Sequence, residues 1–81
     1  MELKDTIQQM NSEDYKERFK AEYNQLKIRL EKLHNFIVKY DAGTLNFEPT
    51  CPINVLMTQE KHMRNYIITL EVRAEIECIK L

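Results

Sequence analysis

Residues 12–40 read SEDYKERFKAEYNQLKIRLEKLHNFIVKY and contain neither glycine nor proline. Apolar and aromatic side chains recur in this stretch at alternating steps of four and three residues: Phe19, Tyr23, Leu26, Leu30, Leu33, Ile37 and Tyr40. Such steps place side chains on one face of an α-helix. Ser12 is suited to cap the first turn, and the acidic Glu13 and Asp14 complement the helix dipole. We therefore predict a long amphipathic helix over residues 12–40.

A second long helix is predicted over residues 52–79. Gly43, the only glycine, fits the left-handed position that follows a helix, so residues 41–51 are expected to form a loop. Pro52 suits the first turn of the next helix. The apolar stripe of this second helix comprises Leu56, Met63, Ile67, Leu70 and Ala74. Residues 70–78 also alternate between apolar and charged, as a strand does. We favour a helix because no turn signal precedes them and the chain offers no partner strand.

Residues 2–10 carry Leu3, Ile7 and Met10 at helical spacing, which predicts a short helix that needs support from the rest of the chain. The expected fold class is all-α, with one domain over residues 1–81 in which a short helix precedes a long antiparallel hairpin. A further apolar stripe lies on the last helix: Ile68, Val72, Ile76 and Ile79. Because a hairpin has a core only one layer thick, we expect this stripe to join chains into a homo-oligomeric helical bundle.

Composition excludes several classes of protein. The chain has 12 basic and 13 acidic residues and a net charge of −1, which argues against general nucleic-acid binding. No apolar run approaches the length of a membrane span, and the opening MELKDTIQQM lacks the apolar core of a signal peptide. Cys51 and Cys78 would lie roughly 40 Å apart on one helix, too far for a disulfide. We expect a protein of the cytoplasm with free thiols and no membrane partner.

The sequence carries no recognisable catalytic or metal-binding motif. The two histidines, His34 and His62, come within about one turn of each other in the expected hairpin, but no further ligand for zinc is evident beside them. There is no glycine-rich phosphate loop and no nucleophile with an evident base. We therefore expect no metal, no cofactor and no enzymatic activity.

Tyrosine and arginine side chains near the apolar seams are the candidate ligand-binding residues: Tyr15, Arg18, Tyr23, Arg29, Tyr66 and Arg73. Arginine makes planar, bidentate contacts with phosphate, and tyrosine stacks on bases. A cleft between chains that held this set would suit a small nucleotide. The more ordinary interpretation is structural: Arg73 would pair with Glu22 across the hairpin, and the tyrosines would pack with hydrated hydroxyl groups.

Several segments resemble a family of short proteins from phages and prophages of gut bacteria, related to a small protein of crAss-like phages. The resemblance lies in DYKERFKAEYNQLKIRLEKL (14–33), the DAG turn (41–43), the CP step (51–52), Gln59, Met63, Tyr66 and LEVRAEIE (70–77). It implies a phage-encoded accessory protein of the bacterial cytoplasm. In size and expected fold the chain is also similar to phage sponge proteins, which sequester cyclic nucleotide or ADP-ribose-type signals of defence systems such as CBASS and Thoeris.

Two functions follow from these observations. The first is a homo-oligomeric sponge that binds a cyclic oligonucleotide or a cyclic ADP-ribose-type signal without catalysis and so counters host defence. The alternative is a protein-interaction module that inhibits a host protein, such as a defence nuclease, through a helical face. A sponge needs a cleft that holds arginine and tyrosine, whereas an inhibitor needs an exposed patch. The sequence leaves both open.

Overall fold

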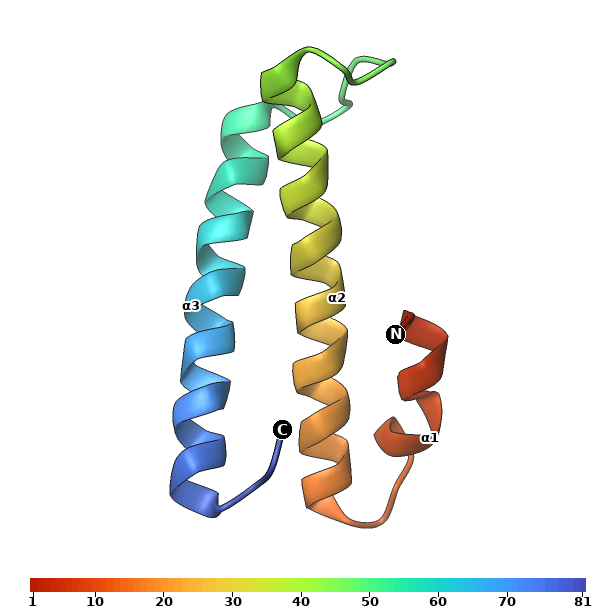
Figure 1. Ribbon diagram of the computed structural model, residues 1–81, viewed down its shortest axis with the longest axis vertical. Coiled ribbons are helices and arrows are strands. Elements are labelled where there is room, and N and C mark those ends of the chain that lie inside the picture. Colours follow the sequence, from red (N-terminus) through yellow and green to blue (C-terminus); the bar gives the residue numbers. More distant parts are fainter.

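The computed structural model describes residues 1–81 as an all-helical chain without strands (Figure 1). A single 3₁₀ turn, η1 (Leu3–Thr6), leads into the short α1 (Ile7–Met10), and the long α2 (Tyr15–Ala42) and α3 (Ile53–Glu77) follow. The all-α prediction is confirmed. Helix also prevails over the alternating pattern near the end of α3, where good helix formers predominate and no second strand is available.

The two ends of α2 are set by different signals. Asp14, rather than the predicted Ser12, caps the helix, because its carboxylate accepts a hydrogen bond from the Lys16 backbone N–H at 2.9 Å. The Ser12 hydroxyl instead accepts from the Asp14 backbone N–H at 3.1 Å, which shapes the turn before the helix. At the other end Gly43 has a φ of 74° and ends α2 in the left-handed conformation, as predicted.

Helix α3 ends earlier than the predicted residue 79. Cys78 takes a left-handed backbone conformation with a φ of 56°, and the chain then turns back. The Ile79 N–H donates to the Ala74 carbonyl at 2.8 Å, and the Ile79 side chain is buried in the core. Ile79 therefore does not belong to the exposed stripe in which the sequence placed it. Ile68, Val72 and Ile76 remain exposed.

Helices α2 and α3 lie side by side and run in opposite directions (Figure 1). Side-chain hydrogen bonds join Tyr15 to Glu77, Tyr23 to Glu71 and His34 to Glu60. The residue numbers of these pairs sum to 92 or 94, which fixes the register along the whole length of the two helices. The buried cluster between them comprises Phe19, Tyr23, Leu70, Ala74 and Ile79, with Leu26 and Ile67 packed against it.

The N-terminal segment packs on the side of α2 that faces away from α3 (Figure 1). Thr6 is fully buried there, and its hydroxyl donates to the Leu3 carbonyl at 2.7 Å and accepts from the Gln25 amide at 2.9 Å. Ala21 of α2 is also buried. The predicted helix over residues 2–10 is thus realised as a 3₁₀ turn followed by one α-helical turn. Neither long helix has an apolar stretch that could span a bilayer.

Candidate functional site

A groove of about 530 Å³ runs along one side of the contact between α2 and α3. Residues from the middle of each helix line it: Tyr23, Lys27, Leu30, Glu31, His34, Asn35, Arg64, Ile67 and Glu71. On α2 the members at 27, 31 and 34 are four and three residues apart, so they share one flank of the helix. The volume lies within the range of about 300–1,000 Å³ that small-molecule sites occupy.

The floor of the groove is apolar at its centre and polar at one end. Leu30 is buried and Ile67 is half-buried. The Tyr23 hydroxyl donates to Glu71 Oε2 at 3.1 Å, and Lys27 Nζ lies 5.9 Å from the centroid of the Tyr23 ring. Burial, together with the bonded Glu71 carboxylate, raises the pKa of Tyr23, so this side chain stays a neutral hydrogen-bond donor.

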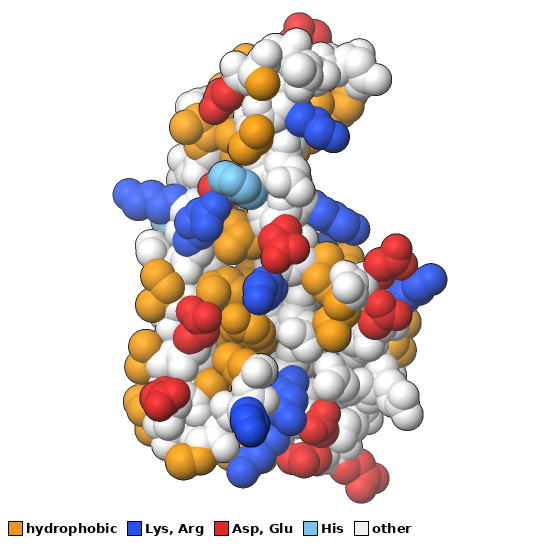
Figure 2. All heavy atoms as spheres, in the orientation of Figure 1, with side chains coloured by type: hydrophobic (Ala, Val, Ile, Leu, Met, Phe, Trp, Pro, Cys, Tyr) orange, Lys and Arg blue, Asp and Glu red, His pale blue; other side chains and the backbone are white.

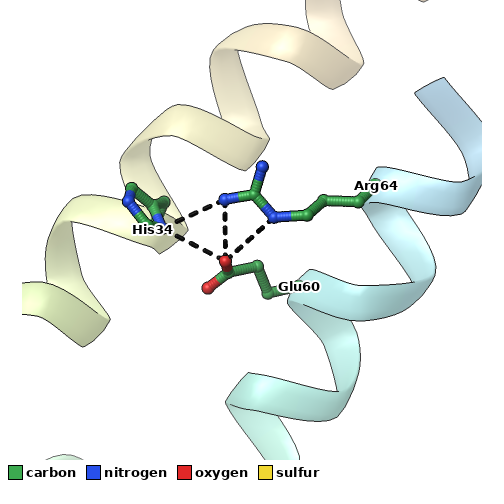
Figure 3. Close-up of polar contacts among 3 residues, drawn as sticks. All are labelled: His34, Glu60 and Arg64. Atoms are coloured by element: carbon green, nitrogen blue, oxygen red, sulfur yellow. Dashed lines mark hydrogen bonds and ion pairs between the residues drawn. The ribbon is translucent and has the colours of Figure 1, made fainter. Parts of the chain in front are cut away.

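Three side chains from the two helices form a polar cluster at the other end of the groove (Figure 3). Arg64 donates to Glu60 Oε1 from Nη2 at 2.8 Å and from Nε at 3.1 Å. His34 Nδ1 lies 3.1 Å from the same carboxylate oxygen and 3.1 Å from Arg64 Nη2. It can donate to Glu60 when protonated at this nitrogen and accept from Arg64 when not. Arg64 Nη1 makes no hydrogen bond within the chain and points away from Glu60 (Figure 3).

This cluster keeps opposite charges in place beside the groove. The hydrogen bond from the Arg64 guanidinium holds the pKa of Glu60 below its ordinary value, and His34 acts in the same direction. The groove lining itself contains two fixed cations, Lys27 and Arg64, and two carboxylates, Glu31 and Glu71. Arg64 Nη1, the one amino group of this guanidinium without a partner in the chain, is the donor of the lining best suited to an added anion.

A family model, Sequestin, matches residues 13–76 of the chain. The chain belongs to the Sequestin family. The match includes all of α2 and nearly all of α3, and hence every residue of the groove. The family name denotes sequestration, which fits a small binding protein of the phage type. No curated protein matches the chain, and no solved structure does.

Of the six residues predicted to bind ligand in this Sequestin chain, Tyr23 alone lines the groove. Arg18 Nη1 donates to the backbone carbonyls of Ser12 and Glu13 at 2.8 and 2.9 Å, which ties down the turn before α2. Arg29 is exposed and takes part in no ion pair or side-chain hydrogen bond within the chain. Arg18 is thus engaged locally, and Arg29 is free.

The remaining three predicted residues contact carboxylates across or along the helices. Tyr15 and Arg73 both bind Glu77, at 3.3 Å each, and the Arg73 guanidinium lies 4.8 Å from the centroid of the Phe19 ring. Tyr66 hydrogen-bonds Glu22. The structural interpretation expected Arg73 to pair with Glu22, and this pair is not formed. Glu22 instead accepts a hydrogen bond from Tyr66. Arg73 pairs with Glu77, which lies one turn away on the same helix.

Sequence reasoning missed Lys27, His34, Asn35 and Arg64 as a common lining. It considered His34 only as a partner of His62 for zinc, and no group of three metal-ligating side chains comes together in the structure. The sequence nevertheless contained a signal that brings His34, Glu60 and Arg64 together. The antiparallel register places His34 opposite Glu60, and Arg64 follows Glu60 by one helical turn.

The Glu60 cluster predicts a pH-dependent contribution to stability. The pKa of Glu60 is lower in the folded chain than its ordinary value of 4.5. Ionised Glu60 therefore contributes its full stabilisation of the folded chain above pH 4.5, and this contribution is lost as the pH falls through the folded pKa. Arg64 is half exposed, so we expect Glu60→Gln to cost only about 0.5–1 kcal/mol at neutral pH. Melting curves should show this difference at pH 7 and lose it at low acidic pH. Glu48→Gln, in the exposed loop, is the matched control, and an equal difference at all pH values would contradict the assignment.

Proposed function

We propose that this Sequestin-family chain binds a small nucleotide signal in the groove between α2 and α3 and holds it without catalysis. The observation that carries the proposal is the Arg64 guanidinium, which lines the groove and has an amino group with no partner in the chain. Arg64 Nη1 can donate a charge-assisted hydrogen bond to a phosphate oxygen, and Glu60 already fixes the position of the guanidinium.

Other groove residues match the remaining parts of a nucleotide. Lys27 supplies a second cation for phosphate, and the half-exposed His34 ring offers a flat surface for a base. Asn35 has an amide that can donate to and accept from a base edge. Leu30 and Ile67 form an apolar floor. These features favour a cyclic oligonucleotide or a cyclic ADP-ribose-type molecule, in which phosphates and bases lie close together.

In this proposal the chain is a phage-encoded counter-defence protein that acts in the cytoplasm of the bacterial host. Its resemblance to short phage proteins and the meaning of the Sequestin name support this role. The antiparallel helix pair would work as a homo-oligomeric bundle, with several grooves in one particle. Removing a signal by binding alone requires at least one groove for each signal molecule, which suits a small chain made in quantity.

A thermal-shift assay with cyclic dinucleotides, cyclic trinucleotides and cyclic ADP-ribose isomers tests the proposal. A ligand that binds only the folded state, at 100 times its dissociation constant, adds about 2.7 kcal/mol of stability, and we expect a clear rise in melting temperature for one of these classes. Ligand released from the heated complex should have an unchanged mass. A changed mass would contradict sequestration without catalysis.

Variants locate the site. Lys27→Ala and His34→Ala should each reduce the shift strongly, whereas Arg29→Ala, at an exposed arginine outside the groove, should leave it unchanged. The reverse pattern would move the site to the arginine and tyrosine residues named from the sequence. If no nucleotide raises the melting temperature while a host protein co-purifies with the chain, the alternative of an inhibitory protein-interaction module replaces the proposal.

A further inference from the structure

The loop that joins α2 to α3 holds an aromatic side chain against the outside of α2. The centroid of the Phe47 ring lies 5.8 Å from that of the Phe36 ring, and the two ring planes are tilted by 56°. Aromatic rings attract each other at this spacing and tilt. Phe47 is nevertheless 57% exposed, so much of its ring still faces solvent. The loop therefore presents an aromatic surface that a further ring can cover.

Two hollows adjoin this aromatic pair. The smaller, of about 370 Å³, includes Leu33 of α2 and Leu56 of α3, and the larger has a volume of about 510 Å³. Lys32, Phe36 and Phe47 line both hollows. Figure 2 shows a concave outline below the loop, where apolar and basic side chains lie next to each other. Each volume lies within the range of about 300–1,000 Å³ for small-molecule sites.

The side chains around these hollows carry an excess of positive charge. Lys32 lies four residues before Phe36 and Lys39 lies three residues after it, so both lysines share the side of α2 that carries this ring. Neither lysine forms an ion pair within the chain. No carboxylate lines either hollow, whereas the lining of the groove balances its two cations with two carboxylates. An anionic group beside Phe36 would thus meet two ammonium groups that have no acidic partner.

The smaller hollow restricts the uncharged part of a ligand. Five of its eight lining residues are hydrophobic. The edge of a nucleotide base carries donors and acceptors, which lose free energy when they are buried without partners. A ring with an apolar edge has no such cost, and it can extend the aromatic pair of Phe36 and Phe47. The lining therefore favours a plain aromatic ring over a base.

We propose that the loop end of the chain is a binding site for a small aromatic anion, whose ring packs beside Phe47 and whose charged group lies between Lys32 and Lys39. A lysine ammonium is a point charge on a flexible stem, so it can pair with a carboxylate or a phosphate group. The hollows share only Asn35 with the groove between α2 and α3. This site is therefore separate from the proposed nucleotide site and does not depend on it.

NMR titration of the isotope-labelled full chain with 3-phenylpropanoate tests the site. We expect saturable shifts of the Phe47 and Leu56 signals, with a dissociation constant in the millimolar range that suits so small a ligand. Phenyl phosphate in a parallel titration shows which anionic group the lysines prefer. The neutral 3-phenylpropanamide should bind about tenfold more weakly, because it offers no charge to the lysines. Adenosine monophosphate should also bind more weakly than the acid.

Three results of these titrations would overturn the proposal. The first is the absence of saturable shifts, or shifts confined to groove residues such as Tyr23 and Ile67. The second is equal affinity for the acid and its amide, which would remove the role of the two lysines. The third is tighter binding of adenosine monophosphate than of either phenyl compound, which would contradict the preference for an apolar ring.

Variants separate the ring from the charges. Phe47→Ala should raise the dissociation constant at least about tenfold, and the fold should persist because Phe47 lies outside the buried core. Lys32→Gln combined with Lys39→Gln should weaken binding of the acid about tenfold and leave binding of the amide unchanged. Lys16→Gln combined with Lys61→Gln removes two exposed charges outside both hollows and is the matched control. Equal weakening by the two double variants would show a net-charge effect and overturn the site.

Discussion

Replacing Leu70 by alanine should lower the free energy of unfolding by about 2–5 kcal/mol, the range for a buried leucine. Leu70 is 1% exposed and lies in the cluster that joins α3 to α2. Only 9 of the 81 residues are buried, so few neighbours are available to fill the cavity. Small domains have total stabilities of only a few kcal/mol, and this single change could unfold the chain. Chemical denaturation followed by circular dichroism measures the loss.

Val55→Ala is the matched control on the same helix. Val55 is 49% exposed and lies outside the core cluster, and alanine is the better helix former. The control should change the free energy of unfolding by no more than about 0.5 kcal/mol. Equal effects of the two substitutions would mean that α3 does not pack on α2 through the face that contains Leu70.

The long helices could be predicted because their signals are repeated many times. Along α2 the apolar steps of four and three recur over seven positions, and the structure buries Phe19, Tyr23, Leu30 and Ile37 among them. Tyr40, the last of the series, is 41% exposed, because it lies at the end of α2 beyond the buried part of the helix pair. A repeated pattern tolerates such single exceptions.

The helix ends were less predictable because each depends on one local competition. Ser12 and Asp14 are both good caps, and only the path of the preceding turn decides between them. At the end of α3 a left-handed Cys78 stops the helix, although cysteine gives no such signal in sequence. That turn buries Ile79, which sequence periodicity had placed on the exposed stripe.

The residues of the candidate site were hard to predict because the partners of each arginine side chain depend on the three-dimensional structure. A long, flexible guanidinium can reach a backbone carbonyl, an aromatic ring or a carboxylate, and spacing alone does not distinguish them. Arg18 binds carbonyl groups of the preceding turn, whereas Arg64 is fixed by a glutamate one turn away. The second pairing follows the helical i, i+4 rule and could be anticipated from the sequence. The first could not.

Phe19→Ala should cost about 3–5 kcal/mol, a loss comparable to that of Leu70→Ala or larger. The Phe19 ring is 5% exposed and packs with Leu70 and Ala74 in the buried cluster. Its removal would open the core near the N-terminal end of α2, where the chain after α3 also folds back. Chemical denaturation again gives the magnitude, and a cost below about 1 kcal/mol would show that this end of the core is not packed as described.

The Phe19 ring also forms a cation–π contact with the guanidinium of Arg73. A guanidinium 4.8 Å from a ring centroid gains about 0.5–1 kcal/mol at a partly exposed site. Arg73→Ala removes this contact and the ion pair with Glu77 together, so the single variant cannot separate them. A double-mutant cycle with Phe19→Leu, which keeps an apolar side chain but removes the ring, isolates the contact with the ring. We expect a coupling of about 0.5–1 kcal/mol, which would mean that Arg73 acts in the core. A coupling near zero would mean that the ring does not hold Arg73 and that Glu77 alone fixes its guanidinium.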